Sequence, residues 1–298
     1  MDKKDFGHLV ATLRKEFRNE FDEPMTQSDL AELARIPLIT LQKIEQGRQV
    51  NIKSFYLLNL AEALHLNSHS AQTFFMSSLN IESFQPGKPT TPPQKVLAEL
   101  IQILSNLQNP AYILDDFGDI IALNQIGMAV YNLQLEQMHA PNLLTQYNFN
   151  RFYFSPEFED LRKMMGMVKT EYLQRAVMLY KRRTLKVRNH WYFKQLIPEL
   201  NRYPIFREYW QSQYFLDEDV YAQYKILPLN HPTLGQLKFF SSPNLAATKA
   251  GDLYLFCLQP MDAHTAQVCL QLYRKYAQHP IHLASWPKPP TPAASLMK

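Results

Sequence analysis

The sequence predicts two domains, an all-α domain followed by an α+β domain in which helices pack on an antiparallel sheet. Residues 84–93, FQPGKPTTPP, hold four prolines and one glycine without apolar periodicity, which favours an extended linker. Before this linker, apolar residues recur at the helical period; after it, helical segments alternate with short strand-like runs. We therefore divide the chain into residues 1–83, the linker, a larger domain at 94–262, and a terminal helix with a proline-rich tail at 263–298.

Composition narrows the class of protein. A chain of 298 residues suits two domains, and 46% hydrophobic residues are enough for packed cores. The two cysteines, Cys257 and Cys269, cannot build a disulfide framework, as expected in a reducing compartment. No apolar run reaches about 18 residues, and the first ten residues lack a secretory hydrophobic segment. We therefore expect a cytoplasmic chain without a membrane span.

The first domain is predicted to be entirely helical. Phe6, Leu9 and Leu13 follow the helical period, and Phe55, Leu58, Ala61 and Leu64 form a similar stripe further on. Two short helices lie between these segments. The five expected helices fall within residues 5–21, 26–34, 37–46, 52–66 and 70–79.

The two short helices meet at an abrupt corner. Thr26 is placed to cap the first of them, with Asp29 at the spacing of a capping box. Pro37 disfavours helical geometry in the residue before it and suits the first turn of a new helix. Gly47 is expected to end that helix in a left-handed conformation. Two helices joined by such a turn, the second presenting its outer face, are typical of a helix-turn-helix.

The stretch TQSDLAELARIPLITLQKIEQGRQ resembles the phage-repressor or XRE type of helix-turn-helix, over about residues 6–66. It departs at Arg35, where the family usually has glycine, and at Pro37 and Leu38, where polar residues are usual. The resemblance implies binding to double-stranded DNA by a bacterial regulator. The implied phosphate contacts are Thr26, Gln27, Thr40 and Arg48, and the implied base-edge contacts are Leu38, Ile39, Gln42 and Lys43.

The chemistry of the second short helix fits that role. Gln42 can bond adenine and Lys43 guanine, while Leu38 or Ile39 either contacts thymine methyl groups or belongs to the core. Residues 1–85 contain nine basic and eleven acidic residues, but four of the basic ones and only one acid lie between positions 35 and 53. Because affinity comes largely from phosphate neutralisation, we expect a modest affinity of the monomer and a homodimer on DNA.

The second domain carries no catalytic signature. It lacks a glycine-rich phosphate loop, G-x-S-x-G and H-E-x-x-H, so we predict no enzyme, no metal and no cofactor. A helix is expected at 95–107, then a strand hairpin at 111–124 and a mostly helical middle at about 125–213. Three strands at 221–229, 235–242 and 252–260 and a helix at 264–277 complete it.

Several pieces of this domain resemble the MmyB-like ligand-binding domain of bacterial regulators, which has a PAS-like fold. They are NPAYILDDFGDIIALNQIG, PNLL, YPIFREYW and HPTLGQLKF, in that order. Gln146 stands where the family tends to have arginine, and the acids before the F-x-x-x-W motif are few. The resemblance implies a small hydrophobic, fatty-acid-like ligand.

The residues leave alternatives open for the ligand site. Methionines suit an adaptable apolar pocket but also fill ordinary cores. Arg207 could pair with a carboxylate or be a surface charge, and His231 with Gly235 is expected to shape a turn. The basic run at 180–190 is expected to be solvated, or to assist DNA or an acidic partner. The candidate ligand residues are Met164, Met167, Arg207 and Trp210.

These expectations combine into one hypothesis. The chain is expected to be a sequence-specific DNA-binding transcriptional regulator at the nucleoid, whose PAS-like domain senses a small hydrophobic ligand. The alternative is a DNA-bound adaptor whose second domain docks a protein such as a sigma factor without a small ligand.

Overall fold

The structure is a computed structural model, and it describes most of the chain in two compact units. One unit comprises Met1–Gly87, Met178–Lys194 and Glu208–Phe215; the other comprises Lys88–Val177, Gln195–Arg207 and Leu216–Lys298. The predicted linker falls mostly outside the described residues. These are 3–18, 23–49, 51–66, 68–78, 91–166, 170–212, 226–276 and 279–289.

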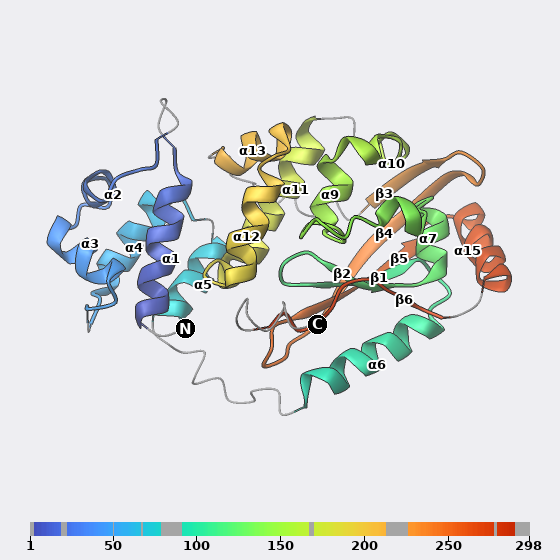
Figure 1. The fold of residues 1–298 in the computed structure, drawn as a ribbon, viewed down its shortest axis with the longest axis horizontal. Helices are drawn as coiled ribbons and strands as arrows, with labels where there is room; N and C mark the ends of the chain where they lie inside the picture. The colour runs from blue at the N-terminus through green and yellow to red at the C-terminus, as the bar shows by residue number, and fades with distance from the viewer. Residues whose placement is uncertain are drawn as a thin grey trace. The chain divides into compact units, whose positions relative to one another are not determined.

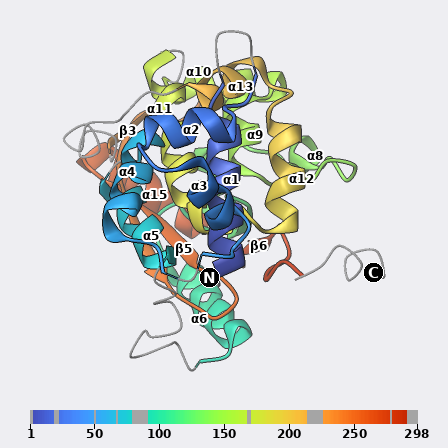
Figure 2. The same cartoon turned by 90° about the vertical axis from the view of Figure 1, so that its left-hand side faces the viewer.

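The first unit contains the five predicted helices, which Figure 2 shows facing the viewer. One apolar core joins them, with Leu9, Leu30, Leu41 and Leu60 fully buried. Phe55 and Leu58, both expected on the stripe of the fourth helix, are instead 49% and 58% exposed. The helices are α1 Lys3–Glu16, α2 Gln27–Leu33, α3 Leu38–Glu45, α4 Ser54–Ala63 and α5 Ser68–Ser78.

The corner between α2 and α3 forms by the local rules that predicted it. Thr26 and Asp29 make a complete capping box, with the Thr26 hydroxyl accepting from the Asp29 amide at 3.2 Å. Arg35 has φ of 51°, so it adopts the left-handed conformation that glycine usually supplies. Pro37 is the N-cap of α3 rather than its first helical residue. Gly47 has φ of 67°, and a Cβ there would lie 2.7 Å from the Lys4 Cα.

The basic run at 180–190 is buried or half-buried throughout, contrary to the expectation of a solvated segment. Leu185 belongs to the core of the five-helix module. Arg188 is 2% exposed and forms an ion pair with Glu16 on α1, and the Asn189 amide donates to the Asp5 carbonyl at 2.7 Å. Residues 178–194 therefore pack with the helices that carry the corner.

The second unit is built on an antiparallel sheet (Figure 1), six-stranded within the described residues. The strand order is β3-β4-β5-β1-β2-β6. The last of the three predicted later strands, β5, therefore pairs with β1 of the hairpin on one side and with β4 on the other. The connections between the predicted strands, at 230–234 and 243–251, are shorter than expected, because β3 runs through His231 and β4 through Ala246. The strands are β1 Ala111–Asp115, β2 Ile120–Leu123, β3 Ile226–His231, β4 Gly235–Ala246, β5 Leu253–Pro260 and β6 Ile281–His282.

Helices accompany this sheet, and the predicted helix before the hairpin and the one after the last long strand are both present. The helix α6 packs on one face through Leu100 and Leu104, which share a core with Ile113 and Leu255. The remaining helical middle is divided into short pieces. The helices after residue 90 are α6 Pro93–Asn106, α7 Gln125–Val130, α8 Leu135–Met138, α9 Phe149–Phe154, η2 Pro156–Phe158, α10 Glu159–Met164, α11 Thr170–Arg183, η3 Thr184–Val187, α12 Trp191–Leu200, α13 Pro204–Gln211 and α15 Ala263–Lys275. Of these, η3 and parts of α11, α12 and α13 belong to the first unit.

The described start of the proline-rich tail, residues 286–289, and the segment before it at 281–285 are held against the second unit. Strand β6 pairs with β2, and the Ala284 amide donates to the Ile120 carbonyl at 3.2 Å. Trp286 packs beside the core under α6. The Lys288 ammonium lies 2.6 Å from an Asp119 carboxylate oxygen. This segment therefore extends the sheet.

Candidate nucleic-acid interface and ligand cavity

The outer face of helix α3 carries both apolar and polar side chains. Leu41 and Ile44 are buried, whereas Ile39 is 65% exposed and Leu38 39% exposed. The two unusual apolar residues are therefore surface groups and not core. Below them is a surface hollow of about 570 Å³, lined by Ile39, Gln42, Lys43, Gln46, Arg48, Gln49 and Asn51.

The predicted DNA-contact residues lie on this part of the first unit, but some of their side chains are already hydrogen-bonded within the protein. Ile39, Gln42, Lys43 and Arg48 share the hollow. Thr26 is exposed, but its hydroxyl already accepts from the Asp29 amide. Thr40 and Gln27 are half-buried, and Gln27 donates its side-chain amide to a Glu45 oxygen at 2.6 Å. Gln46, Gln49 and Asn51 also line the hollow, and the sequence prediction did not include them.

A buried charged pair holds α3 in place. The Arg14 Nε lies 2.7 Å from one Glu45 oxygen, and its Nη2 lies 3.0 Å from the other. The remaining nitrogen, Nη1, donates to the Met25 carbonyl at 2.6 Å. A bidentate pair between a guanidinium and a carboxylate is a strong and directional interaction, and all of its partners here belong to the first unit. The pair thus ties α1 to the last turn of α3 and, through Gln27, to the first turn of α2.

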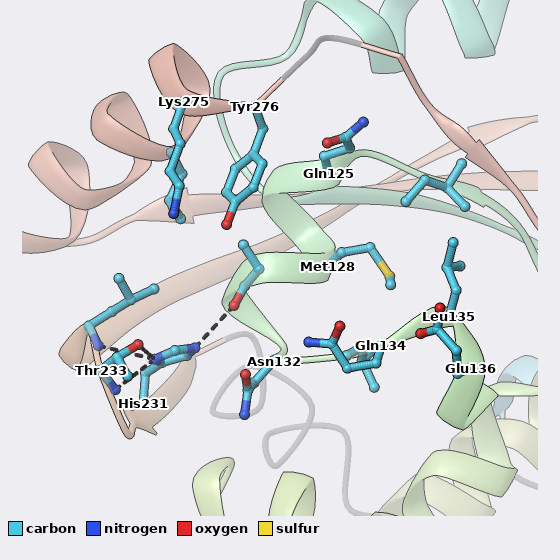
Figure 3. A pocket seen from close by; sticks show the side chains of 15 residues that line it. Gln125, Met128, Asn132, Gln134, Leu135, Glu136, His231, Thr233, Lys275 and Tyr276 are labelled. Atoms are coloured by element: carbon cyan, nitrogen blue, oxygen red, sulfur yellow. Dashed lines mark hydrogen bonds between the residues drawn. The ribbon is translucent and has the colours of Figure 1, made fainter.

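The second unit holds a cavity of about 420 Å³ (Figure 3). Its walls come from α7, α8, the β3–β4 turn, the last turn of α15 and Ile281 of β6. Met128, Leu133 and Leu272 supply apolar surface, and several amide and charged side chains lie around them. A cleft of this size and mixed lining is typical of small-molecule sites.

His231 shapes the turn at one wall, as the sequence predicted. Its Nδ1 accepts from the Thr233 and Leu234 amides at 3.2 and 3.1 Å, and its Nε2 donates to the Ala129 carbonyl at 3.0 Å. These contacts require the neutral ring with the proton on Nε2. Burial lowers the pKa of His231, which favours the same neutral form.

The predicted ligand residues do not line this cavity. Met164 is 6% exposed in the core near α10, and Met167 lies outside the described residues. Arg207 is exposed. Trp210 is 3% exposed and lies 4.9 Å from the Arg188 guanidinium, stacked in the unit that contains the first five helices. Trp210 and Arg207 thus fall in different compact units.

The β1 face opposite α6 carries an aromatic layer that the sequence analysis did not identify. Tyr112 stacks on Phe256 of β5 at 5.1 Å between ring centroids and on Phe149 of α9 at 6.4 Å. Burial raises the pKa of Tyr131 and Tyr153 well above the usual value for the phenol. The sequence gives little indication of this aromatic layer, because its residues come from β1, α9, β5 and the end of α7, which lie apart along the chain.

A second buried charge cluster closes the β1–β2 turn. Asp115 is fully buried, and its Oδ1 accepts from the Phe117 and Asp119 amides, both at 2.9 Å. Burial, together with the neighbouring Asp119 charge, raises the pKa of Asp115 to about 7. Lys288 lies 3.8 Å from the other Asp115 oxygen and neutralises part of the charge. The cluster therefore joins the turn to the C-terminal segment.

The cysteines are structural side chains. Cys257 and Cys269 are both free and buried. Burial raises the pKa of Cys257, and that of Cys269 to about 12, so neither thiol ionises readily. Among the described residues, no group of three or more histidine, cysteine or acidic side chains could hold a metal ion, and no helix is long and apolar enough to cross a membrane.

The chain therefore combines a helical module, which exposes a short helix after a corner, with an α+β domain that contains a cavity. The family model of the MmyB-like transcription regulator ligand-binding domain matches residues 96–272. The chain belongs to this family, and it is therefore a transcription regulator with this C-terminal domain, a class that is not typically enzymatic. No curated protein sequence matches the chain.

Proposed function

We propose that the chain is a sequence-specific DNA-binding regulator of the XRE type, with α3 as its recognition helix. The observation that carries this proposal is the exposed face of α3. Ile39 is 65% exposed and lies beside Gln42, Lys43 and Arg48. Leu41 and Ile44 already anchor this helix of eight residues in the core, so packing does not explain a further large apolar side chain on its outer face. Lysine and glutamine at such positions pair with guanine and adenine, and Ile39 would meet a thymine methyl group.

The local charge supports the same surface. Positions 35 to 53 hold four basic residues and one acid, and that acid, Glu45, is buried against Arg14. The outer face therefore carries positive charge without an opposing exposed carboxylate from this stretch. Because the module as a whole is slightly acidic, binding by one copy would be weak, and we propose a homodimer on two half-sites one helical turn apart.

The proposed signal is a small hydrophobic, fatty-acid-like ligand of the PAS-like domain. Residues 178–194 lie within the stretch matched by the ligand-binding family, yet they pack with α1–α5 in one compact unit. A ligand that prefers one arrangement of this segment would change how the DNA-binding helices are presented. This supports a sensor more directly than a passive adaptor.

Operator binding tests the recognition helix. Genome-wide mapping of bound sites supplies the operator, and fluorescence anisotropy then compares the wild type with Gln42→Ala/Lys43→Ala. We expect a loss of about 1–3 kcal/mol for each base contact and a salt slope smaller by about one. The matched control is Gln102→Ala/Lys95→Ala on exposed positions of α6. Unchanged affinity and slope in the α3 variant would show that another surface binds DNA.

The ligand is tested separately. Organic extraction of the purified full chain, followed by mass spectrometry, should recover a lipid. If none is recovered and a sigma factor or another protein binds the second domain instead, the adaptor function replaces the sensor.

A further inference from the structure

The cavity between α7, α8 and the end of α15 differs from a lipid site in its lining. It places one cation and one carboxylate on opposing walls, with amide side chains between them and apolar side chains beneath. We propose that this cavity binds a small zwitterion of the amino-acid type, either a free apolar amino acid or a short peptide, independently of the hydrophobic ligand and of DNA.

The walls are tied to one another, so the cavity exists before a ligand arrives. His231 joins the β3–β4 turn to α7 through the Ala129 carbonyl at 3.0 Å. His264 of α15 lies with its Nε2 3.1 Å from the Leu234 carbonyl of the same turn. The dashed contacts of His231 in Figure 3 show how the turn is held at the cavity edge. A preformed site loses little conformational entropy on binding.

The charged groups define the two ends of the ligand. Lys275 and Tyr276 extend toward the cavity from the end of α15, whereas Glu136 lies on the opposite side of the view on α8 (Figure 3). The Lys275 ammonium lies 5.1 Å from the Tyr276 ring centroid, and within the described residues neither it nor Glu136 has an ion-pair partner. A carboxylate would meet Lys275, and an ammonium would meet Glu136.

The middle of the cavity suits a short polar body with an apolar side chain. The amides of Gln125, Asn132 and Gln134 border the space, and the described residues offer no hydrogen-bond partner to these three side chains. Met128 and Leu272 lie at the apolar surface. A fatty acid would pair with Lys275 but would offer no cation to Glu136. The volume of about 420 Å³ admits an amino acid or a di- or tripeptide.

Isothermal titration calorimetry of the full chain tests this with four probes: leucine, the dipeptide leucyl-leucine, octanoate and octylamine. We expect leucine or the dipeptide to bind and both single-charge probes to bind about two- to fivefold more weakly, since each lacks one ion pair with an exposed side chain. Stronger binding of leucine identifies the free amino acid, and stronger binding of the dipeptide identifies a peptide. Octanoate or octylamine binding equally well would overturn the proposal, as would no binding of leucine or dipeptide up to about 10 mM.

Variants locate the site. Lys275→Met and Glu136→Gln remove one charge each at exposed positions, and each should weaken binding about two- to fivefold. Lys95→Met and Glu99→Gln, the same changes at exposed positions of α6, should have no effect. Ala129→Leu places a larger side chain in the lining of the cavity and should weaken binding. Equal affinity in the cavity variants and the α6 controls would place the zwitterion elsewhere and refute the assignment. DNA binding plays no part in these measurements, so their outcome is separate from that of the proposed function.

Discussion

Replacing Arg14 with methionine removes the cation from a buried pair and leaves the Glu45 carboxylate inside the first unit. The side chains of Arg14 and Glu45 are 9% and 6% exposed, and they share two contacts of 2.7 and 3.0 Å. Gln27 remains as a hydrogen-bond donor to Glu45, but a neutral amide cannot balance the charge. We therefore expect a large loss of stability confined to this unit.

The magnitude follows from what each variant leaves behind. An uncompensated buried charge costs about 3–5 kcal/mol of unfolding free energy. The double variant Arg14→Met/Glu45→Met leaves no buried charge, but the Met25 carbonyl and the Gln27 amide lose a partner. Each lost hydrogen bond costs about 1 kcal/mol, so the double variant should be more stable than either single variant.

Urea unfolding followed by tryptophan fluorescence measures this in a Trp286→Phe background, where Trp191 and Trp210 of the first unit remain. The control is Glu159→Ala/Lys163→Ala, which removes an exposed ion pair and should change nothing measurable. If Arg14→Met costs no more than the control, or if the double variant is the least stable, the reasoning from a buried unpaired charge is wrong.

Three further predictions concern the second unit. The pKa of Asp115 is raised from 3.8 to about 7, so its contribution to stability is full below pH 3.8 and is lost as pH rises to about 7. Asp115→Asn should flatten that fall in urea midpoints, and an unchanged slope would contradict the burial of its charge. The pKa of His231 is lowered from 6.5, so stability is lost as pH falls below 6.5. His231→Gln should remove this acid loss, and a persisting loss would assign it to another group. Cys257 and Cys269 should not react with a thiol reagent at pH 8 until urea unfolds the chain; rapid labelling of the native chain would contradict their burial.

The helices of the first domain were predictable because their signals are local. Thr26 and Asp29 lie three residues apart, and Gly47 directly follows the last turns of α3, so a short segment contains both the start and the stop. The hairpin of β1 and β2 was predictable for the same reason. The register of β5 beside β1 was not, since Ala111 and Cys257 are brought together by the whole domain.

The structure brings most of the candidate DNA-contact residues together, whereas it separates the candidate ligand residues. Ile39, Gln42, Lys43 and Arg48 come from one short stretch, and one helix with its following loop brings them together. The cavity combines α7, α8, the β3–β4 turn and α15, and no local pattern connects Glu136 with Lys275. Methionine content suggested Met164 instead, because an apolar side chain in a core and one in a cavity have the same sequence pattern.

The sequence by itself determined the all-α domain with its sharp corner, the strand hairpin and the exposed positive charge near α3, because caps, prolines, glycines and periodicity act over a few residues. Only the tertiary structure decided that Leu38 and Ile39 are surface groups, that Arg14 pairs with Glu45, that the basic run around Arg188 is buried, and that Lys288 anchors the C-terminal segment. These contacts join residues far apart in the chain, and whether a side chain is buried depends on what the rest of the fold places against it.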